Sequence, residues 1–276
     1  MSRHSVFFEG VAQVEATLAG QPAKLPIFYY DGTSQTAVFA ARLHAVRELM
    51  PDPRLVPARL APGIGAVAVS CFEYRDTDIG AYNELAISVV LNDPPFSLNA
   101  PGRAVVNGLR RRQLHAWVHH LPVTTEIARA GGVLLYNYPK FVASIEFREG
   151  GPRRACRLAE GDEHILTLTG ERLPARRAEQ VQLFSHLWMD RQPQSSEFKI
   201  NALETGRSLR PGAARLELGS RHPIARELDS LLLSRRSIHY ELTERFEGIL
   251  YGPEHLTLPL VRRALAMTEA GEPAVR

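Results

Sequence analysis

The sequence predicts a single, mainly β (α+β) domain: a closed or cone-like antiparallel β-barrel with a few peripheral helices. Six runs of strand length alternate with turn residues at fairly regular spacing, whereas only three stretches have helical periodicity. The 276 residues, 45% of them hydrophobic, are enough for a sizeable core. We find no internal repeat or long linker, so one domain should span residues 1–276, with a core over about 21–260 and frayed ends.

The predicted strands are short or alternating apolar runs. They cover Leu25–Tyr30, Gly65–Tyr74, Glu84–Leu91, Leu114–Leu121, Phe141–Arg148 and His164–Thr169. Glycine, proline and aspartate punctuate these runs, as is typical of turns: Asp31-Gly32, Pro62-Gly63, Pro94-Pro95, Gly150-Gly151-Pro152 and Gly170. Such spacing favours an antiparallel sheet that is mostly a meander.

Three segments have helical patterns. Residues 36–50 carry apolar side chains at helical spacing and end against Pro51. A shorter helix is predicted over Thr125–Ala130, with Thr124 as N-cap and Gly131-Gly132 as the stop. The third runs over Pro223–Ser234.

Composition excludes several classes of protein. The net charge is +3, and the arginine pairs are scattered between acidic residues, so we expect no nucleic-acid partner. No apolar stretch reaches the roughly 18 to 20 residues of a membrane-spanning helix. Two cysteines, Cys71 and Cys156, are too few for a disulfide framework, and the N-terminus lacks a secretory pattern. A cytoplasmic location without membrane contact is the resulting expectation.

The sharpest local motif is Tyr136-Asn137-Tyr138-Pro139-Lys140-Phe141. The chain has only three lysines among 33 basic residues, so each of them invites inspection. A lysine among aromatic rings is partly desolvated, which disfavours its ammonium form and suits a nucleophilic amine. Alternatively, its stem packs on the tyrosine rings while its charged end reaches water.

A second signal is the segment Asp76–Glu84, which joins two strong strand patterns. Glu84 opens the second strand, where it could point into a barrel mouth and serve as an acid, a base or the partner of an amine. An exposed acid at a strand end is the plainer interpretation.

Together the two segments resemble the acetoacetate decarboxylase superfamily. The resemblance covers roughly residues 24–250, and its matching segments are Phe28-Tyr29-Tyr30, Met50-Pro51-Asp52-Pro53, Tyr82-Asn83-Glu84, Ala128-Arg129-Ala130-Gly131-Gly132-Val133 and Tyr138-Pro139-Lys140. It implies a Schiff-base lysine at Lys140, a supporting carboxylate at Glu84, a small keto acid as substrate, no cofactor and self-association into a homo-oligomer. The residues expected to surround the substrate are Tyr82, Tyr136, Tyr138, Phe141 and His115.

Two departures from the family pattern bear on the chemistry. The acetoacetate-cleaving members carry a second lysine where this chain has Phe141, and their active-site arginine has no counterpart around Pro22-Ala23-Lys24. Burial alone can still favour a neutral amine. Decarboxylation, an aldolase or dehydratase reaction, carboxylate binding without catalysis, and a purely structural role therefore all remain open.

The histidines are a weaker signal. On a strand over Leu114–Leu121, His115 and His119 would share one face, and His120 would point the other way. Two histidines on one face bind a metal only if a third ligand joins them. No cysteine cluster or His-Glu-x-x-His pattern supports such a site, so we expect no metal and interpret these residues as a polar barrel wall.

Overall fold

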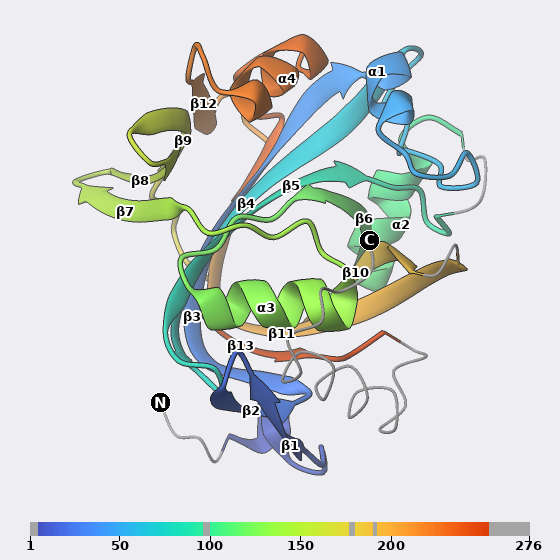
Figure 1. Ribbon diagram of the computed structural model, residues 1–276. Helices are drawn as coiled ribbons and strands as arrows, with labels where there is room; N and C mark the ends of the chain where they lie inside the picture. The colour runs from blue at the N-terminus through green and yellow to red at the C-terminus, as the bar shows by residue number, and fades with distance from the viewer. Residues whose placement is uncertain (1–4, 96–99, 177–179, 190–191, 254–276) are drawn as a thin grey trace.

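The architecture is that of a computed structural model, which describes residues 5–95, 100–176, 180–189 and 192–253. Within these ranges seven strands form a closed barrel in the order β10-β11-β13-β3-β4-β5-β6 (Figure 1). Their bounds are β3 Ile27–Arg42, β4 Ile64–Thr77, β5 Tyr82–Val90, β6 Gln113–His120, β10 Gln180–Met189, β11 Gln192–Ser208 and β13 His239–Leu250. The neighbours pair antiparallel except β6 and β10, which close the barrel as a parallel pair. The predicted mainly β, single-domain barrel is thus confirmed.

Two smaller sheets and the helices complete the domain. One sheet has the order β12-β9-β8-β7, and the other is the hairpin of β1 with β2. Their bounds are β1 Val14–Leu18, β2 Gln21–Leu25, β7 Ser144–Gly150, β8 Arg153–Glu160, β9 Glu163–Glu171 and β12 Ala214–Leu218. The helices are η1 Val6–Phe8, α1 Leu43–Glu48, α2 Arg103–Arg111, α3 Glu126–Tyr136 and α4 Pro223–Leu231. None of the described helices is long and apolar enough to cross a membrane.

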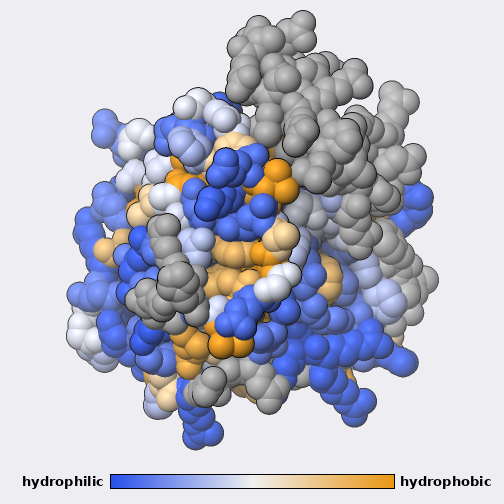
Figure 2. All heavy atoms as spheres, turned by 90° about the horizontal axis from the view of Figure 1, so that it is seen from below, coloured by the Kyte–Doolittle hydropathy of each residue, from blue (hydrophilic) through white to orange (hydrophobic). Residues whose placement is uncertain are grey.

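Two apolar clusters make up most of the core. The larger lies between barrel strands and the four-stranded sheet, where Phe39 of β3 and Leu158 of β8 are fully buried. The second surrounds α3, whose buried side chains pack with aromatic residues of the barrel such as Phe246. Figure 1 shows α3 lying between β5 and β13. Seen from below, the side of β1 and β2, the surface is mostly hydrophilic with apolar side chains near its centre (Figure 2).

The helix predicted over residues 36–50 is wrong in its first half. Residues 36–42 continue β3, and only Leu43–Glu48 are helical. From Thr33 onward every second residue of β3 is buried, among them Ala37, Phe39 and Ala41. Alanine is a strong helix former, so its presence at buried positions concealed the two-residue period of the strand.

The sequence predicted a turn at Asp31-Gly32 and a helix stop at Gly131-Gly132. Both predictions are wrong. At Asp31 and Gly32 the pairing of β3 with β4 shifts register, and the strand continues. A Cβ at Gly32 would lie 2.6 Å from Cζ of Phe246, so this glycine permits close packing within a strand. Helix α3 likewise passes through both of its glycines and ends at Tyr136.

Several element boundaries also differ from the predictions. β7 begins at Ser144 rather than Phe141, because before Ser144 the segment forms only an isolated bridge, between Val142 and Val123. Helix α3 has Thr125 rather than Thr124 at its N-cap, and the Thr124 hydroxyl accepts a hydrogen bond from the amide of Asn83. At the N-terminus β1 precedes the predicted start of the core, and its Leu18 is buried. The predicted C-terminal fraying beyond residue 260 lies outside the described residues.

Candidate functional site

The end of α3 determines where Lys140 lies. Asn137 follows the helix with φ +50°, and its amide bonds back to the last helical turn. This left-handed residue reverses the chain, so that the amide of Tyr138 donates to the carbonyl of Gly132 at 3.1 Å. The returning segment is then held by hydrogen bonds from Leu121 to the Pro139 carbonyl and from residue 123 to the carbonyl of residue 141. Lys140 is thereby fixed between the helix and the chain that leaves β6.

Lys140 and Glu84 are in direct contact. The Lys140 Nζ lies 2.6 Å from Oε2 of Glu84, and the two side chains are only 6% and 11% exposed. The Tyr74 hydroxyl donates to the other carboxylate oxygen at 3.2 Å. The structure thus brings the two residues together, and the lysine amine is withdrawn from water rather than extended into it.

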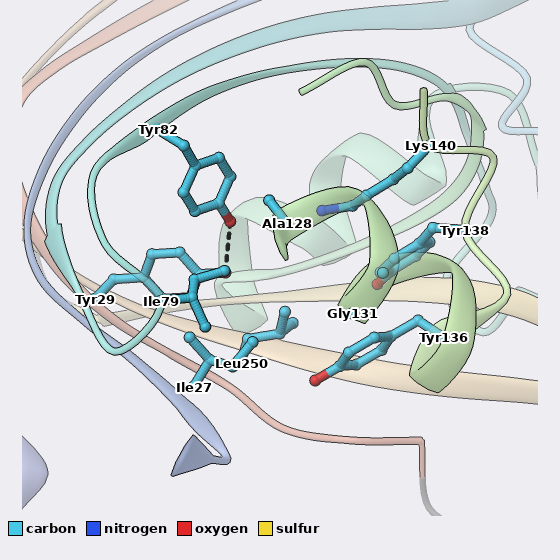
Figure 3. Close-up of a pocket in the computed structure, with 11 residues that line it drawn as sticks. Ile27, Tyr29, Ile79, Tyr82, Ala128, Gly131, Tyr136, Tyr138, Lys140 and Leu250 are labelled. Atoms are coloured by element: carbon cyan, nitrogen blue, oxygen red, sulfur yellow. Dashed lines mark hydrogen bonds between the residues drawn. The ribbon is translucent and has the colours of Figure 1, made fainter. Parts of the chain in front are cut away.

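Lys140 also reaches a narrow pocket beside α3 (Figure 3). Figure 3 shows its side chain pointing inward, with Tyr29 and Tyr82 on one side and Tyr136 and Tyr138 on the other. The remaining lining residues are apolar or glycine: Ile27, Ile79, Ala128, Gly131, Gly132 and Leu250. The amine is therefore the one cationic group among the lining residues. The pocket has room for little more than a water molecule, so a larger ligand needs side-chain movement to enter.

Four tyrosine hydroxyls give the pocket its polar character. The hydroxyls of Tyr29 and Tyr82 are 3.0 Å apart, and that of Tyr138 contacts two serine hydroxyls of the barrel wall at 2.6 and 2.8 Å. The rings of Tyr136 and Tyr138 stack with centroids 5.2 Å apart. Lys140 Nζ lies 5.9 Å from the centroids of both the Tyr82 and Tyr138 rings, within the range of a cation–π contact.

Burial keeps these phenols protonated. It raises the pKa of Tyr29, Tyr82 and Tyr136 well above the ordinary value, and it raises the pKa of Tyr138 to about 12. The charge of Glu84 adds to this effect at Tyr29 and Tyr82. At neutral pH the hydroxyls are therefore hydrogen-bond donors, able to hold an anionic or carbonyl oxygen next to the amine.

Gly132 makes the space that the lysine stem occupies. A Cβ at this position would lie 2.3 Å from Cδ and 2.4 Å from Cε of Lys140. Neither distance is possible for carbon atoms in contact, so the lysine could not lie here beside any other residue. The sequence predicted a helix stop at this glycine. The signal that was available is a glycine inside a helical pattern, which often marks close packing.

Two of the residues expected to surround the substrate lie elsewhere. Phe141 packs against the larger core cluster, on the other side of its segment from Lys140. His115 is at the seam between β6 and β10, where its Nδ1 lies 3.0 Å from Nε2 of His186 and its ring stacks on Phe184. Neither lines the pocket, whereas Tyr82, Tyr136 and Tyr138 do. Tyr29 and Tyr74 were not predicted as site residues, because they reach the site only through the pairing of β3, β4 and β5.

Comparisons with known proteins give a family match and similar folds. The family model described as acetoacetate decarboxylase (ADC) matches residues 16–243, a range that contains both Glu84 and Lys140. A crystal structure of acetoacetate decarboxylase from Legionella pneumophila subsp. pneumophila str. Philadelphia 1 is similar with a TM-score of 0.57 and 14% identity, covering 82% of this chain and 86% of that chain. The enduracididine biosynthesis enzyme MppR, in complex with the condensation product of pyruvate and imidazole 4-carboxaldehyde, gives a TM-score of 0.58 and 12% identity, covering 89% and 97%. At these identities the likeness shows the fold. Curated proteins give no match.

Proposed function

Because this chain belongs to the acetoacetate decarboxylase family, we propose that it is a Schiff-base-forming carbon–carbon lyase acting on a small keto acid. The observation that carries the proposal is the buried contact of 2.6 Å between Lys140 Nζ and Glu84 Oε2 at the edge of a tyrosine-lined pocket. A lysine in water is about 1 part in 2,500 neutral at pH 7. A site that uses its amine as a nucleophile must therefore provide a route for the proton to leave.

Glu84 provides that route. Its Oε2 accepts a proton from the ammonium of Lys140, and the lone pair left on Nζ then attacks the carbonyl carbon of the keto acid. The transfer turns two buried charges into two neutral groups. The hydroxyl of Tyr74 holds the carboxyl in place through its other oxygen.

The later steps use the iminium as an acceptor for the electron pair of the bond that breaks. A proton moves from the attacking nitrogen to the former carbonyl oxygen, which gives the carbinolamine. Glu84 then returns its proton to this hydroxyl, which leaves as water and gives the iminium on Lys140. The bond to the substrate carboxylate then breaks, carbon dioxide leaves, and the electron pair moves into the enamine. A proton adds to the enamine carbon, and water hydrolyses the iminium, releasing the ketone and the lysine.

The tyrosines take over the binding of the substrate's oxygens in this proposal. The pocket lining contains no arginine, and position 141 supplies no second cation. Buried, protonated hydroxyls at Tyr29, Tyr82 and Tyr136 are the donors nearest to hand for a carboxylate or carbonyl oxygen. Such neutral donors bind a carboxylate less tightly than guanidinium, so the site suits an anion that is consumed or neutralised during the reaction.

An aldolase or dehydratase reaction is the second candidate. It shares the iminium but forms the enamine by loss of a carbon-bound proton, after which the enamine attacks an aldehyde. Its support is the fold shared with MppR, which was solved in complex with pyruvate and with a condensation product of pyruvate and an aldehyde.

Carboxylate binding without catalysis is the less favourable interpretation. Glu84 already neutralises the amine of Lys140, and its negative charge would repel an anionic ligand at the same site. A binding protein would be expected to leave its cation unpaired. A cytoplasmic location and self-association remain further parts of the proposal.

Reductive trapping tests the proposal directly. The protein is incubated with acetoacetate or pyruvate and cyanoborohydride, and its intact mass is measured. We expect one adduct per chain, which Lys140→Arg abolishes because guanidinium stays protonated and forms no iminium. Lys24→Arg, at an exposed position, is the matched control and should retain the adduct. Adduct formation undiminished in Lys140→Arg would refute the mechanism, and carbon dioxide release from acetoacetate separates the decarboxylase from the aldolase.

A further inference from the structure

Three metal-ligating side chains converge between the end of β6 and helix α4. Nε2 of His119 lies 3.0 Å from Oε1 of Glu227, and Nε2 of His120 lies 2.7 Å from Oε2 of the same carboxylate. One ligand atom from each residue lies within 4.8 Å of the other two. The side chains are 21%, 22% and 32% exposed, so a dissolved ion can reach them. None of them lines the Lys140 pocket.

A β-bulge explains how two consecutive histidines face one carboxylate. Alternation along a strand would point His119 and His120 to opposite sides, as the sequence predicted. In the pairing of β5 with β6, however, Ile87 faces His120 while the next residue, Ser88, faces Val118. His119 is therefore the extra residue of a bulge, a feature that redirects a side chain. The two imidazole centroids are consequently only 4.3 Å apart.

Helix α4 holds the third ligand in place. Its buried residues Ala225, Leu228 and Leu231 pack into the domain, which fixes the rotation of the helix about its axis. Glu227 lies outside this apolar set and turns toward β6. The hydroxyl of Ser230 also donates to the Glu227 carbonyl at 2.7 Å. The carboxylate thus comes from a packed helix and the imidazoles from a barrel strand, so each ligand is presented by a rigid element.

We propose that His119, His120 and Glu227 form a binding site for a divalent transition ion of the Zn²⁺ type. Two imidazole nitrogens and one carboxylate oxygen are a ligand set that zinc accepts, and they leave a position open to water. Ligands at zinc distances in a tetrahedron are about 3.4 Å apart. The present ligand atoms all lie within 4.8 Å of one another, so small side-chain movements would bring them to that spacing. On binding, each Nε2 turns its lone pair to the ion, and each ring keeps its proton on Nδ1.

An ionic clamp between β6 and α4 is the competing explanation. A clamp is complete with one histidine on the carboxylate, whereas here two imidazoles are directed at its two oxygens. In an ionic clamp a proton lies between each imidazole nitrogen and the carboxylate, whereas in the proposed site a metal ion lies there. The two explanations therefore differ in whether the chain binds metal with a defined stoichiometry.

Titration with metal decides between them. Protein without a histidine tag, stripped with a chelator, is titrated with Zn²⁺ by calorimetry and with Co²⁺ by visible absorption. We expect one ion per chain, a tetrahedral cobalt spectrum, and a higher unfolding temperature with Zn²⁺, because the ion binds the folded state. His120→Gln and Glu227→Gln should each weaken Zn²⁺ binding at least tenfold. Removal of a residue that only supports a metal ligand already lowers metal affinity by about that factor.

His44→Gln is the matched control, because His44 is exposed and lies outside the cluster. It should bind Zn²⁺ as the unaltered protein does. If Glu227→Gln fails to fold, His119→Gln removes a ligand at a partly exposed position instead. Absence of an ion at one per chain would overturn the proposal, and so would affinity that falls less than tenfold in the folded cluster variants. Neither result depends on the activity proposed for Lys140.

Discussion

Replacing Gly132 with alanine is the sharpest test of how the site positions its amine. The added methyl would lie 2.3 Å from Cδ and 2.4 Å from Cε of Lys140. Carbon atoms in contact prefer about 3.5 Å or more, so the lysine stem must move by about 1.2 Å. The methylene groups belong to a flexible side chain, which makes the movement inexpensive for the fold. It nevertheless opens the contact of 2.6 Å with Glu84.

The expected loss is in rate and not in stability. Alanine stabilises a helix interior by about 1 kcal/mol relative to glycine, which offsets part of the strain. A displacement of about 1 Å at a reacting group can lower the rate about 100-fold. Gly132→Ala should therefore fold, and it should form the trapped adduct about 100 times more slowly.

The assay is the rate of cyanoborohydride trapping, followed by intact mass at fixed keto acid concentration. Gly131→Ala is the companion variant, because it adds the same methyl one residue earlier in α3. There the methyl would lie 2.9 Å from a terminal carbon of Leu18 and away from the lysine. We expect a smaller decrease in Gly131→Ala than in Gly132→Ala. Equal rates in the folded Gly132→Ala variant and the unaltered protein would show that the position of the stem does not control the amine.

Three further outcomes are expected. Glu84→Gln should slow adduct formation by roughly 10²- to 10⁴-fold, the usual contribution of a general base. It should also lower the free energy of unfolding, measured in urea, by about 3 kcal/mol, since it leaves Lys140 buried without its partner. An unchanged rate would remove Glu84 from the mechanism. Burial holds the pKa of His186 at about 4, below its unfolded value near 6.5. Stability is then full above pH 6.5 and declines by about 3 kcal/mol as the pH falls to 4; urea unfolding at both pH values should show a decline that His186→Gln reduces. Phe141→Lys should lower stability by about 1 to 3 kcal/mol without accelerating adduct formation, and a faster reaction would contradict this.

The parts of the fold that the sequence predicted are those with a clear local period. β4, β5, β6 and β9 coincide with predicted runs to within about three residues, because each alternates or is continuously apolar between turn residues. The second half of β3 was mistaken for a helix because alanine, a strong helix former, occupies two of its buried positions, Ala37 and Ala41. Gly32 was mistaken for a turn because only the ring of Phe246, from β13, explains it.

The residues of the candidate site also fall into those that the sequence predicted and those that it could not predict. Lys140 and Glu84 carry sequence motifs, so the resemblance to a family could name them. Tyr74 could not be named, because its place depends on register: it pairs directly with Tyr82, two residues before Glu84 on the same side of β5. The bulge that turns His119 and His120 to the same side also depends on the pairing of two strands, so no local sequence pattern predicts it.

Phe141 shows how a missing motif residue is best judged from geometry. Successive residues of an extended segment point to opposite sides. Lys140 lines the pocket beside α3, and Phe141 accordingly packs into the other core cluster. A lysine at this position would start toward an apolar core and away from the amine that it is meant to influence. In the proposed mechanism a second cation at this position therefore has no place to act, and the burial of the pair between Lys140 and Glu84 is what remains to make the amine reactive.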